Sequence, residues 1–245
     1  MKIVFSRKGF DSSTGGGPSP IVGGRPVTLP IPNRTGPAAT RYGELGLGEH
    51  VALASRGALR ADSLCHHDPM FLADETCLFG QCGAAQAHLA NRGVAVGDLF
   101  LFFGLFRAPG ERPHHRFFGY LRVVEMVAIA TASAERLQAL SAHRHPHALG
   151  PHGSNDVIYV GPGRTAQNAA DTLRLTVPEG PPSLWAVPDW LAEAGLSYHD
   201  RADRWVVGGR LRSASRGQEF VADIGDRARP RAWAEDMIAT IEGRA

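Results

Sequence analysis

The fold of the chain is decided by residues 93–129, which read GVAVGDLFLFFGLFRAPGERPHHRFFGYLRVVEMVAI. A turn segment at 93–98 leads into a continuous apolar run at 99–106, and a second apolar run covers 117–129. Short apolar runs bounded by turn residues are typical of buried strands. This stretch therefore predicts a β-hairpin with a buried face, and it places His114 and His115 in the exposed connection between the strands.

Outward from the hairpin, short strands and helices alternate. The patterns predict strands at 2–5, 156–160, 173–177 and 205–207, and helices at 80–91, 133–142, 188–194 and 231–241. A further extended piece is expected at 26–32, whereas 33–57 has no clear pattern. We expect one α+β domain over residues 1–245, with a strongly bent mixed or barrel-like sheet flanked by helices.

The composition is that of an ordinary globular protein. The 245 residues are 43% hydrophobic and 20% charged, and 26 basic against 24 acidic residues give a net charge of +2. This balance does not support an extended basic track for DNA. Three cysteines without a CxxC pair argue against a disulfide framework and a zinc ribbon. No apolar stretch is long enough to cross a membrane, so we expect no membrane partner and a cytoplasmic location; no oligomeric state follows.

The segment after the first strand, SRKGFDSSTGGGPSPIVGG at 6–24, has the residue types of an anion-binding loop. Glycines let backbone N–H groups approach phosphate or sugar oxygens, and cationic and hydroxyl side chains add donors. The spacing matches neither a Walker nor a Rossmann loop. Asp11 among these donors suits a general base; alternatively, it closes a turn of its own loop.

Two further segments carry candidate chemistry. In CHHDP (65–69), alternation along an extended chain would direct His66 and Asp68 to one side, where they could bind a metal or act as base and orienter. Alternatively, Asp68 only begins a turn. In SASRGQEFVAD (213–223), Gln218 could read a base edge and Glu219 could serve as acid or base, unless the segment is a turn with an exposed glutamate.

A third group is rich in histidine. His143, His145 and His147 alternate in AHRHPHAL, and His152 follows. Alternation would direct the first three imidazoles to one side of an extended strand, as in a metal site. Pro146 and the following glycines instead indicate a loop, in which a substrate-binding or a solvated histidine is equally compatible with the sequence. We assign no metal ligand and no cofactor from the sequence.

The segments together resemble one family. The segments that carry this resemblance are KIVFSRKGFDSSTGGGPSPI (2–21), CHHDP, GQCGAAQAHL (80–89), the two hairpin strands and RGQEFV (216–221). From residue 2 to about 223 the chain resembles the nucleotide-modification-associated domain family, third type. The resemblance implies a bacterial or phage context of modified DNA bases, and it singles out Ser6 and Gln81 among the matching positions. Residues 96–124 also look like the hairpin of PUA-like modules, which read modified bases.

The resemblance and the residue types together lead to an enzyme that acts on a nucleotide or on a base flipped out of DNA. Alternatives are a non-catalytic PUA-like reader of modified bases and a metal-dependent hydrolase that uses the histidines. We expect catalytic roles for Asp11, Lys8, His66, Asp68 and Glu219. Substrate contacts are expected from Ser6, Arg7, Ser12, Ser13, Gly15, Gly16, Gln81 and Gln218.

Overall fold

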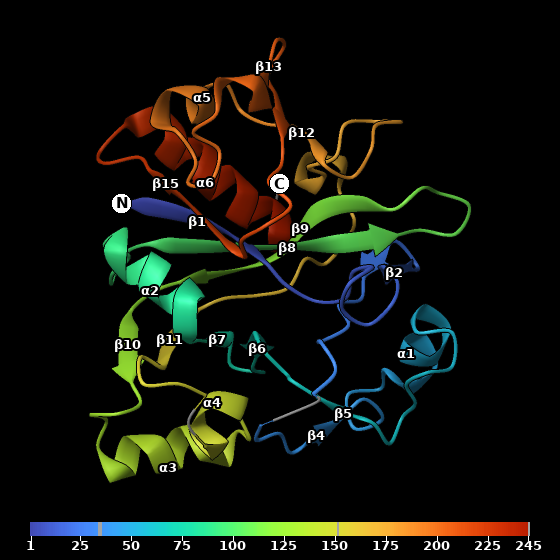
Figure 1. Ribbon diagram of the computed structural model, residues 1–245, viewed down its shortest axis with the longest axis vertical. Coiled ribbons are helices and arrows are strands. Elements are labelled where there is room, and N and C mark those ends of the chain that lie inside the picture. Colours follow the sequence, from blue (N-terminus) through green and yellow to red (C-terminus); the bar gives the residue numbers. More distant parts are fainter. Residues whose placement is uncertain (34–35, 151, 245) are drawn as a thin grey trace.

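The computed structural model describes residues 1–33, 36–150 and 152–244 and has an α+β fold (Figure 1). A six-stranded sheet has the order β15 (Glu219–Asp223), β1 (Lys2–Arg7), β8 (Leu99–Arg107), β2 (Ser19–Val22), β3 (Arg25–Pro26), with β9 (His114–Arg122) on the other edge of β8. A four-stranded sheet has the order β10 (Glu125–Ala128), β11 (Val157–Pro162), β7 (Thr76–Gln81), β6 (Met70–Phe71). Among the described residues no sheet closes on itself, so the bent arrangement is open rather than a barrel.

In the described residues, smaller sheets and six helices surround these two sheets. The remaining strands are β12 (Leu184–Ala186), β14 (Arg210–Arg212) and β13 (Trp205–Val206) in one sheet, and β4 (Thr40–Arg41) and β5 (Leu64–Cys65) in another. The helices are α1 (Gly48–Ala54), α2 (Gly83–Asn91), α3 (Ala134–Ala142), α4 (Pro146–Leu149), α5 (Trp190–Ala194) and α6 (Ala228–Ile241). In the described part of the chain, none of them is long and apolar enough to cross a membrane.

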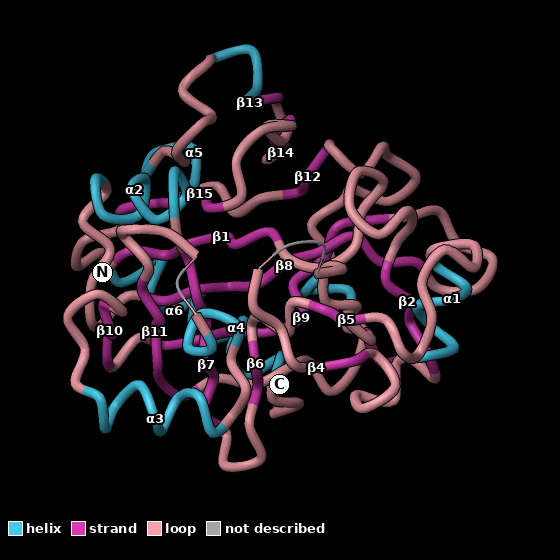
Figure 2. Tube along the Cα trace, turned by 60° about the horizontal axis from the view of Figure 1, so that its bottom comes forward, coloured by secondary structure: helices cyan, strands magenta, loops and turns pink. Residues whose placement is uncertain are grey.

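Strand β8 is buried on both faces, which explains its unbroken apolar sequence. Leu99, Leu101 and Phe103 pack into one cluster with residues of α6 and β12. Phe100 and Phe102 point the other way and pack against Phe79 of β7 and Tyr159 of β11. Figure 2 shows the strands of the four-stranded sheet running across the direction of β1 and β8, with α3 beyond them.

The pairing of β1 and β2 with β8 determines where the glycine-rich loop lies. β1 runs parallel to β8 from Ile3–Leu99 to Arg7–Phe103, and β2 joins the same edge farther along, at Ser19–Phe106. Residues 8–18 must therefore leave the sheet at the carboxyl end of β1 and return before β2. A small cluster of Phe10, Leu29, Tyr42, Val51 and Cys65 lies beneath this loop.

The predicted hairpin is confirmed, but its second strand breaks in two. Residues 117–129 pair first with β8 as part of β9 and then, from Glu125, with β11 as β10, so the chain passes from one sheet to the other. The exposed position expected for His114 and His115 is wrong: both lie at the start of β9, and His114 is 1% exposed.

Most other predicted elements are confirmed, with shifted ends. The helix predicted at 80–91 begins at Gly83 because Gly80 and Gln81 complete β7, and the last helix begins at Ala228. Ser133 caps α3 by accepting from the N–H of Arg136 at 3.2 Å. The strand predicted at 173–177 is wrong: a short 3₁₀ turn ends at Leu173, and only isolated bridges follow. The piece at 26–32 forms little strand because its prolines cannot donate to a ladder.

His115 leads to a prediction about stability and pH. Its ring packs edge-on against Phe103 and Trp185, and burial, together with the positive charge of Arg7, lowers the pKa of His115 from 6.5 to about 4. As the pH falls from about 6.5 to about 4, the imidazole of His115 therefore binds a proton in the unfolded chain but not in the folded protein, and this favours unfolding. Relative to a His115→Gln variant, the wild-type protein should lose up to about 3 kcal/mol of unfolding free energy over this range.

Urea denaturation of both proteins at a series of pH values measures this difference. A difference that stays constant between neutral pH and pH 4 would contradict a lowered pKa of the His115 imidazole.

Candidate functional site

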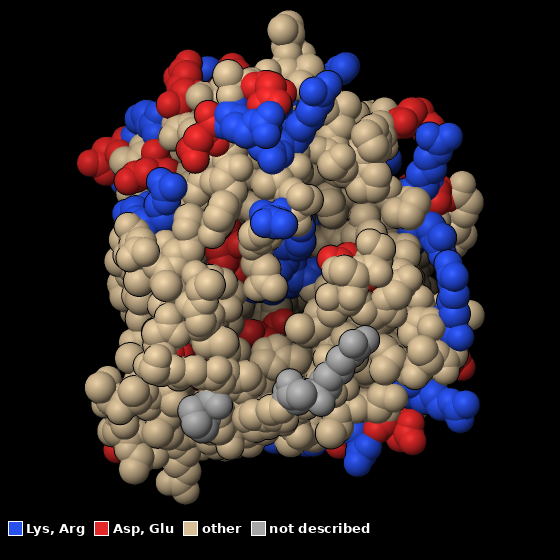
Figure 3. Space-filling view, viewed as in Figure 1, with Lys and Arg blue, Asp and Glu red and all other residues tan. Residues whose placement is uncertain are grey.

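Residues from six segments meet in one pocket at the carboxyl ends of β1 and β7. On the face drawn in Figure 3 the surface is hollowed near its middle, and basic and acidic side chains lie in the hollow. The pocket has a volume of about 230 Å³. Its lining residues are Arg7, Lys8, Gly9, Asp11, Thr14, Ile31, His66, Asp68, Gly80, Gln81, Cys82, His147, His152 and Gln218.

Lys8 is held by the sheet and by a buried carboxylate. Its N–H donates to the carbonyl of Phe103 at 2.8 Å, which extends the pairing of β1 with β8 by one residue. Its Nζ lies 2.7 Å from Oε1 of Glu219 and 4.2 Å from the ring centre of Phe79. The Lys8 side chain is only 10% exposed and that of Glu219 is 1% exposed, so this ion pair is largely removed from water.

Glu219 and Gln81 form a network behind Lys8. The Nε2 of Gln81 donates to the same Oε1 of Glu219 at 2.8 Å, and the Oε1 of Gln81 accepts from the N–H of Cys82 at 3.0 Å. The amide of Gln81 is thus engaged at both ends. Glu219 does not line the pocket, and its Oε2 is buried without a partner among the described residues. The alternative of an exposed Glu219 is therefore wrong.

Arg7 ties the pocket to the segment before β15. Its guanidinium donates to the carbonyls of Ala214 at 2.9 Å and Ser215 at 3.4 Å. Burial lowers the pKa of Arg7, and the nearby carboxylate of Asp11 partly offsets this. The backbone carbonyl of Gln218 accepts from the N–H of Arg7 at 2.7 Å, and Gln218, an exposed residue, lines the pocket.

Asp11 closes a turn of its own loop, as the alternative interpretation holds. Its Oδ1 accepts from the N–H of Ser13 at 2.8 Å, the hydroxyl of Ser13 at 2.7 Å and the N–H of Thr14 at 2.7 Å. The backbone carbonyl of Asp11 accepts from Gly16 at 3.1 Å. Several N–H groups that could bind an anion are therefore used within the loop.

Gly15 of this loop is needed for packing against Phe10. Gly15 has a φ of 91°, and a Cβ there would lie 2.3 Å from the ring of Phe10. Ser12, Ser13, Gly15 and Gly16 line a different pocket, of about 570 Å³, against the segment between α1 and β5. The structure therefore does not bring these four predicted contacts to the pocket of Lys8. Ser6 is fully buried within β1.

The opposite wall of the pocket consists of a carboxylate among imidazoles. The N–H of Asp68 donates to the carbonyl of His66 at 2.9 Å and closes a tight turn. This turn brings the side chains of His66 and Asp68 to one side. The oxygens of Asp68 lie 3.7 Å from Nε2 of His66, 3.4 Å from Nε2 of His145 and 3.8 Å from Nε2 of His147. Burial would raise the pKa of Asp68, but these imidazoles hold it well below its usual range.

The sequence predicts that His66 and Asp68 lie together in this wall, but it does not predict which of the later histidines join them. His66 and Asp68 were expected together, and the structure places them together. The alternation of His143, His145 and His147 suggested one common side, but α4 begins at Pro146 and His143 stays exposed at the end of α3. The structure instead brings His147 and His152 together, with ring centres 4.2 Å apart, and pairs His147 with the buried Asp156.

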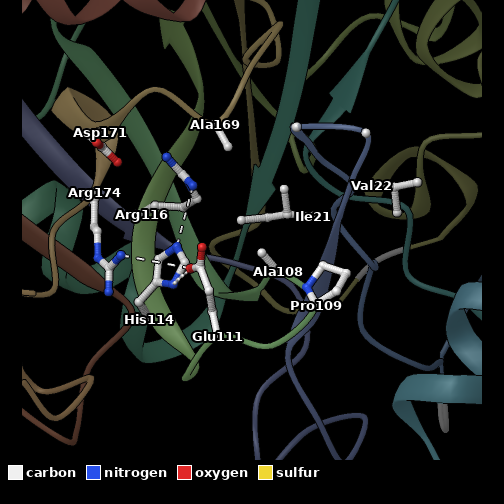
Figure 4. A pocket seen from close by; sticks show the side chains of 12 residues that line it. Ile21, Val22, Ala108, Pro109, Glu111, His114, Arg116, Ala169, Asp171 and Arg174 are labelled. Carbon is white, nitrogen blue, oxygen red and sulfur yellow. Dashed lines mark hydrogen bonds and ion pairs between the residues drawn. The ribbon is translucent and has the colours of Figure 1, made fainter. Parts of the chain in front are cut away.

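A third, separate pocket of about 400 Å³ lies between β9 and the β2–β3 turn (Figure 4). Its polar wall carries Arg116, His114, Glu111 and Arg174, and its other wall is apolar. Arg116 donates to the carbonyl of Ala170 at 2.6 Å, and Glu111 lies 3.8 Å from His114 and 3.9 Å from Arg174. None of the predicted site residues lies here.

Comparison with known proteins agrees with the resemblance of the sequence segments. The family described as nucleotide modification associated domain 3 has a model that matches residues 2–223 of this chain. A comparison with curated proteins and one with solved structures each gave no match.

The ion pair of Lys8 and Glu219 leads to a prediction about stability. A Lys8→Met variant leaves the carboxylate of Glu219 buried without its cation, so the free energy of unfolding should fall by about 3–5 kcal/mol. The double variant Lys8→Met/Glu219→Gln removes both charges and should regain most of this loss. Urea denaturation measures both.

The matched control is Arg201→Met, which breaks an exposed pair with Asp203 whose side chains are 73% and 60% exposed. This change should cost less than about 1 kcal/mol. An equally small loss for Lys8→Met would show that Glu219 does not depend on Lys8.

Proposed function

Because the chain belongs to the nucleotide modification associated domain 3 family, we propose that it is an enzyme that acts on a nucleotide, or on a base flipped out of DNA, in the pocket at the ends of β1 and β7. One observation carries this proposal. Two cationic side chains, Arg7 and Lys8, and a wall of imidazoles and a carboxylate line the same pocket. Cations bind phosphate, and groups that exchange protons or bind metals carry out chemistry on the bound molecule.

The lining of the pocket favours an enzyme over a reader of modified bases. A reader holds its base chiefly by stacking on aromatic side chains and by hydrogen bonds. Among the described residues that line this pocket there is no phenylalanine, tyrosine or tryptophan, whereas four of them are histidine or aspartate on one wall. Such a convergence of ionisable groups in a pocket is typical of a catalytic site.

The pocket size limits which part of the substrate enters. Its volume of about 230 Å³ is below the range of about 300–1,000 Å³ that is usual for small-molecule sites. We therefore expect the reacting part of the nucleotide to enter, while the remainder lies along the open side near Gln218. Base flipping would deliver such a part from DNA, and the near-neutral net charge of +2 fits a local contact.

We assign separate roles to the residues of the pocket. Lys8 has three donors and gives one to Glu219, so its remaining donors, together with the positive charge of Arg7, can hold an anionic group. Glu219 and Gln81 act as positioning residues for Lys8. Asp11 holds the shape of the loop, and His66 and Asp68 face the reacting group.

The proposal is tested by analysis of nucleosides. Modified DNA, unmodified DNA and free nucleotides are each incubated with the protein, digested to nucleosides and examined by mass spectrometry. We expect a nucleoside to appear or disappear in at least one of the three samples. Binding without any change in nucleosides would support a reader instead. If the protein neither binds any of the three samples nor changes their nucleosides, the proposal is overturned.

Gln218 allows a test of the pocket that does not disturb the fold. The residue is exposed and lines the pocket, so Gln218→Ala should weaken binding of the nucleotide about 3- to 10-fold through loss of one hydrogen bond. Gln167→Ala, at an exposed position outside the pocket, is the matched control and should bind like the wild type. Equal affinities for both variants would place the substrate elsewhere.

A further inference from the structure

The imidazole wall of the pocket has the arrangement of a metal site. One ring nitrogen each of His66, His147 and His152 lies within 4.8 Å of the other two. Oδ2 of Asp68 lies 3.7 Å from Nε2 of His66 and 3.8 Å from Nε2 of His147. Four nitrogen and oxygen donors from two separate segments, 66–68 and 147–152, thus surround one small space.

The hydrogen bonds on the far side of two rings determine which nitrogens carry lone pairs. Nδ1 of His152 lies 3.1 Å from the carbonyl of Gly150; since a carbonyl only accepts, this nitrogen carries the proton. Nδ1 of His147 likewise donates to the carboxylate of Asp156. Nε2 of each neutral ring is then a lone-pair donor, and Nε2 of His152 is buried with no partner among the described residues.

The distances fit a bridging cation better than a bridging proton. An N–H to oxygen hydrogen bond measures about 2.7–3.2 Å, which is shorter than the separations of 3.7 and 3.8 Å between Asp68 and the imidazoles. Two ligands at about 2.1 Å from a tetrahedral ion lie about 3.4 Å apart. Contraction by a few tenths of an ångström around the carboxylate, and rotation of the partly exposed His152, would complete the coordination.

The surroundings of the cluster are those of metal-binding histidines, which usually donate their second nitrogen to a carboxylate or a carbonyl. Asp156 serves His147 and also accepts from the N–H of His152 at 2.9 Å. Oδ1 of Asp68 accepts from the N–H of Gly80 at 3.0 Å, which leaves Oδ2 toward the imidazoles. A Cβ at Gly80 would lie 2.3 Å from the ring of His147, so the glycine lets that ring lie against β7.

We propose that His66, His147, His152 and Asp68 bind a divalent first-row transition metal ion at the wall of the pocket. Imidazole-rich sets of this kind suit zinc or iron, whereas magnesium and calcium prefer oxygen ligands. All four residues line the pocket that Arg7 and Lys8 also line, so a ligand from the pocket can complete the coordination. If the proposed function holds, this ligand is an oxygen of a nucleotide, and the metal would polarise it. This part of the inference rests on the proposed function.

Metal content and metal titration test this inference without any nucleotide. Protein purified without a histidine tag should contain about one equivalent of a transition metal by elemental mass spectrometry. After removal of the metal with a chelator, calorimetric titration with zinc chloride should restore a single site. Less than about a tenth of an equivalent, together with no uptake of zinc by the chelator-treated protein, would overturn the inference.

Variants locate the site. His152→Ala changes a partly exposed loop residue and should weaken zinc binding more than about tenfold, while Asp156→Asn should weaken it about 10- to 100-fold through loss of the bond that orients His147. His143→Ala, at an exposed histidine of the same connection, should bind zinc like the wild type. Circular dichroism confirms that each variant is folded, and unchanged zinc binding by a folded His152→Ala would overturn the assignment.

The two proposals fail separately. Zinc binding that leaves nucleosides unchanged would contradict only the proposed function. Turnover of a nucleotide that persists in full after the metal has been removed would contradict only the role of the metal.

Discussion

Strand β8 has no face toward water, and the position of the elements that pack on it and pair with it follows from this constraint. One face of β8 requires the layer of α5, α6 and β12, and the other requires the four-stranded sheet. A strand buried on both faces can offer only its two edges for pairing: β9 takes one of them along its whole length, and β1 and β2 share the other. Because β1 and β2 share an edge, the chain between them is expelled at the carboxyl end of β1, next to the end of β7.

The pocket at these strand ends contains charges that the fold has largely removed from water. Lys8, which lines the pocket, is paired with Glu219 behind it, and the Gln81 amide binds the same carboxylate oxygen. A buried carboxylate is tolerated only when partners compensate for its lost hydration. Asp68 meets the same condition differently, through three imidazoles and the N–H of Gly80. The two walls therefore differ in kind: one presents cations that the sheet positions, and the other presents lone-pair donors that short turns and loops position.

The loop at residues 8–18 has residue types that suit two different structures. Glycine, serine and aspartate are what an anion-binding loop needs, and they are also what a tight turn needs. In this protein Asp11 takes the N–H groups of Ser13 and Thr14 for itself, and Gly15 is required by the ring of Phe10. The ambiguity is resolved by packing against Phe10 and the segment beneath it, which no local pattern reveals.

The sequence by itself determined the elements whose causes are local. Continuous apolar runs bounded by turn residues indicated the hairpin, Ser133 indicated the start of α3, and the matching segments indicated the family. It also singled out Lys8, Asp11, His66 and Gln218, which do meet in one pocket. Only the tertiary structure decided that β9 and β10 belong to different sheets, that Glu219 is buried, and that His152 and Asp156 join His147. These outcomes depend on which segments lie side by side, and this is decided by packing between residues far apart in the chain. The spacing of residues within a short stretch of sequence carries no information about such packing.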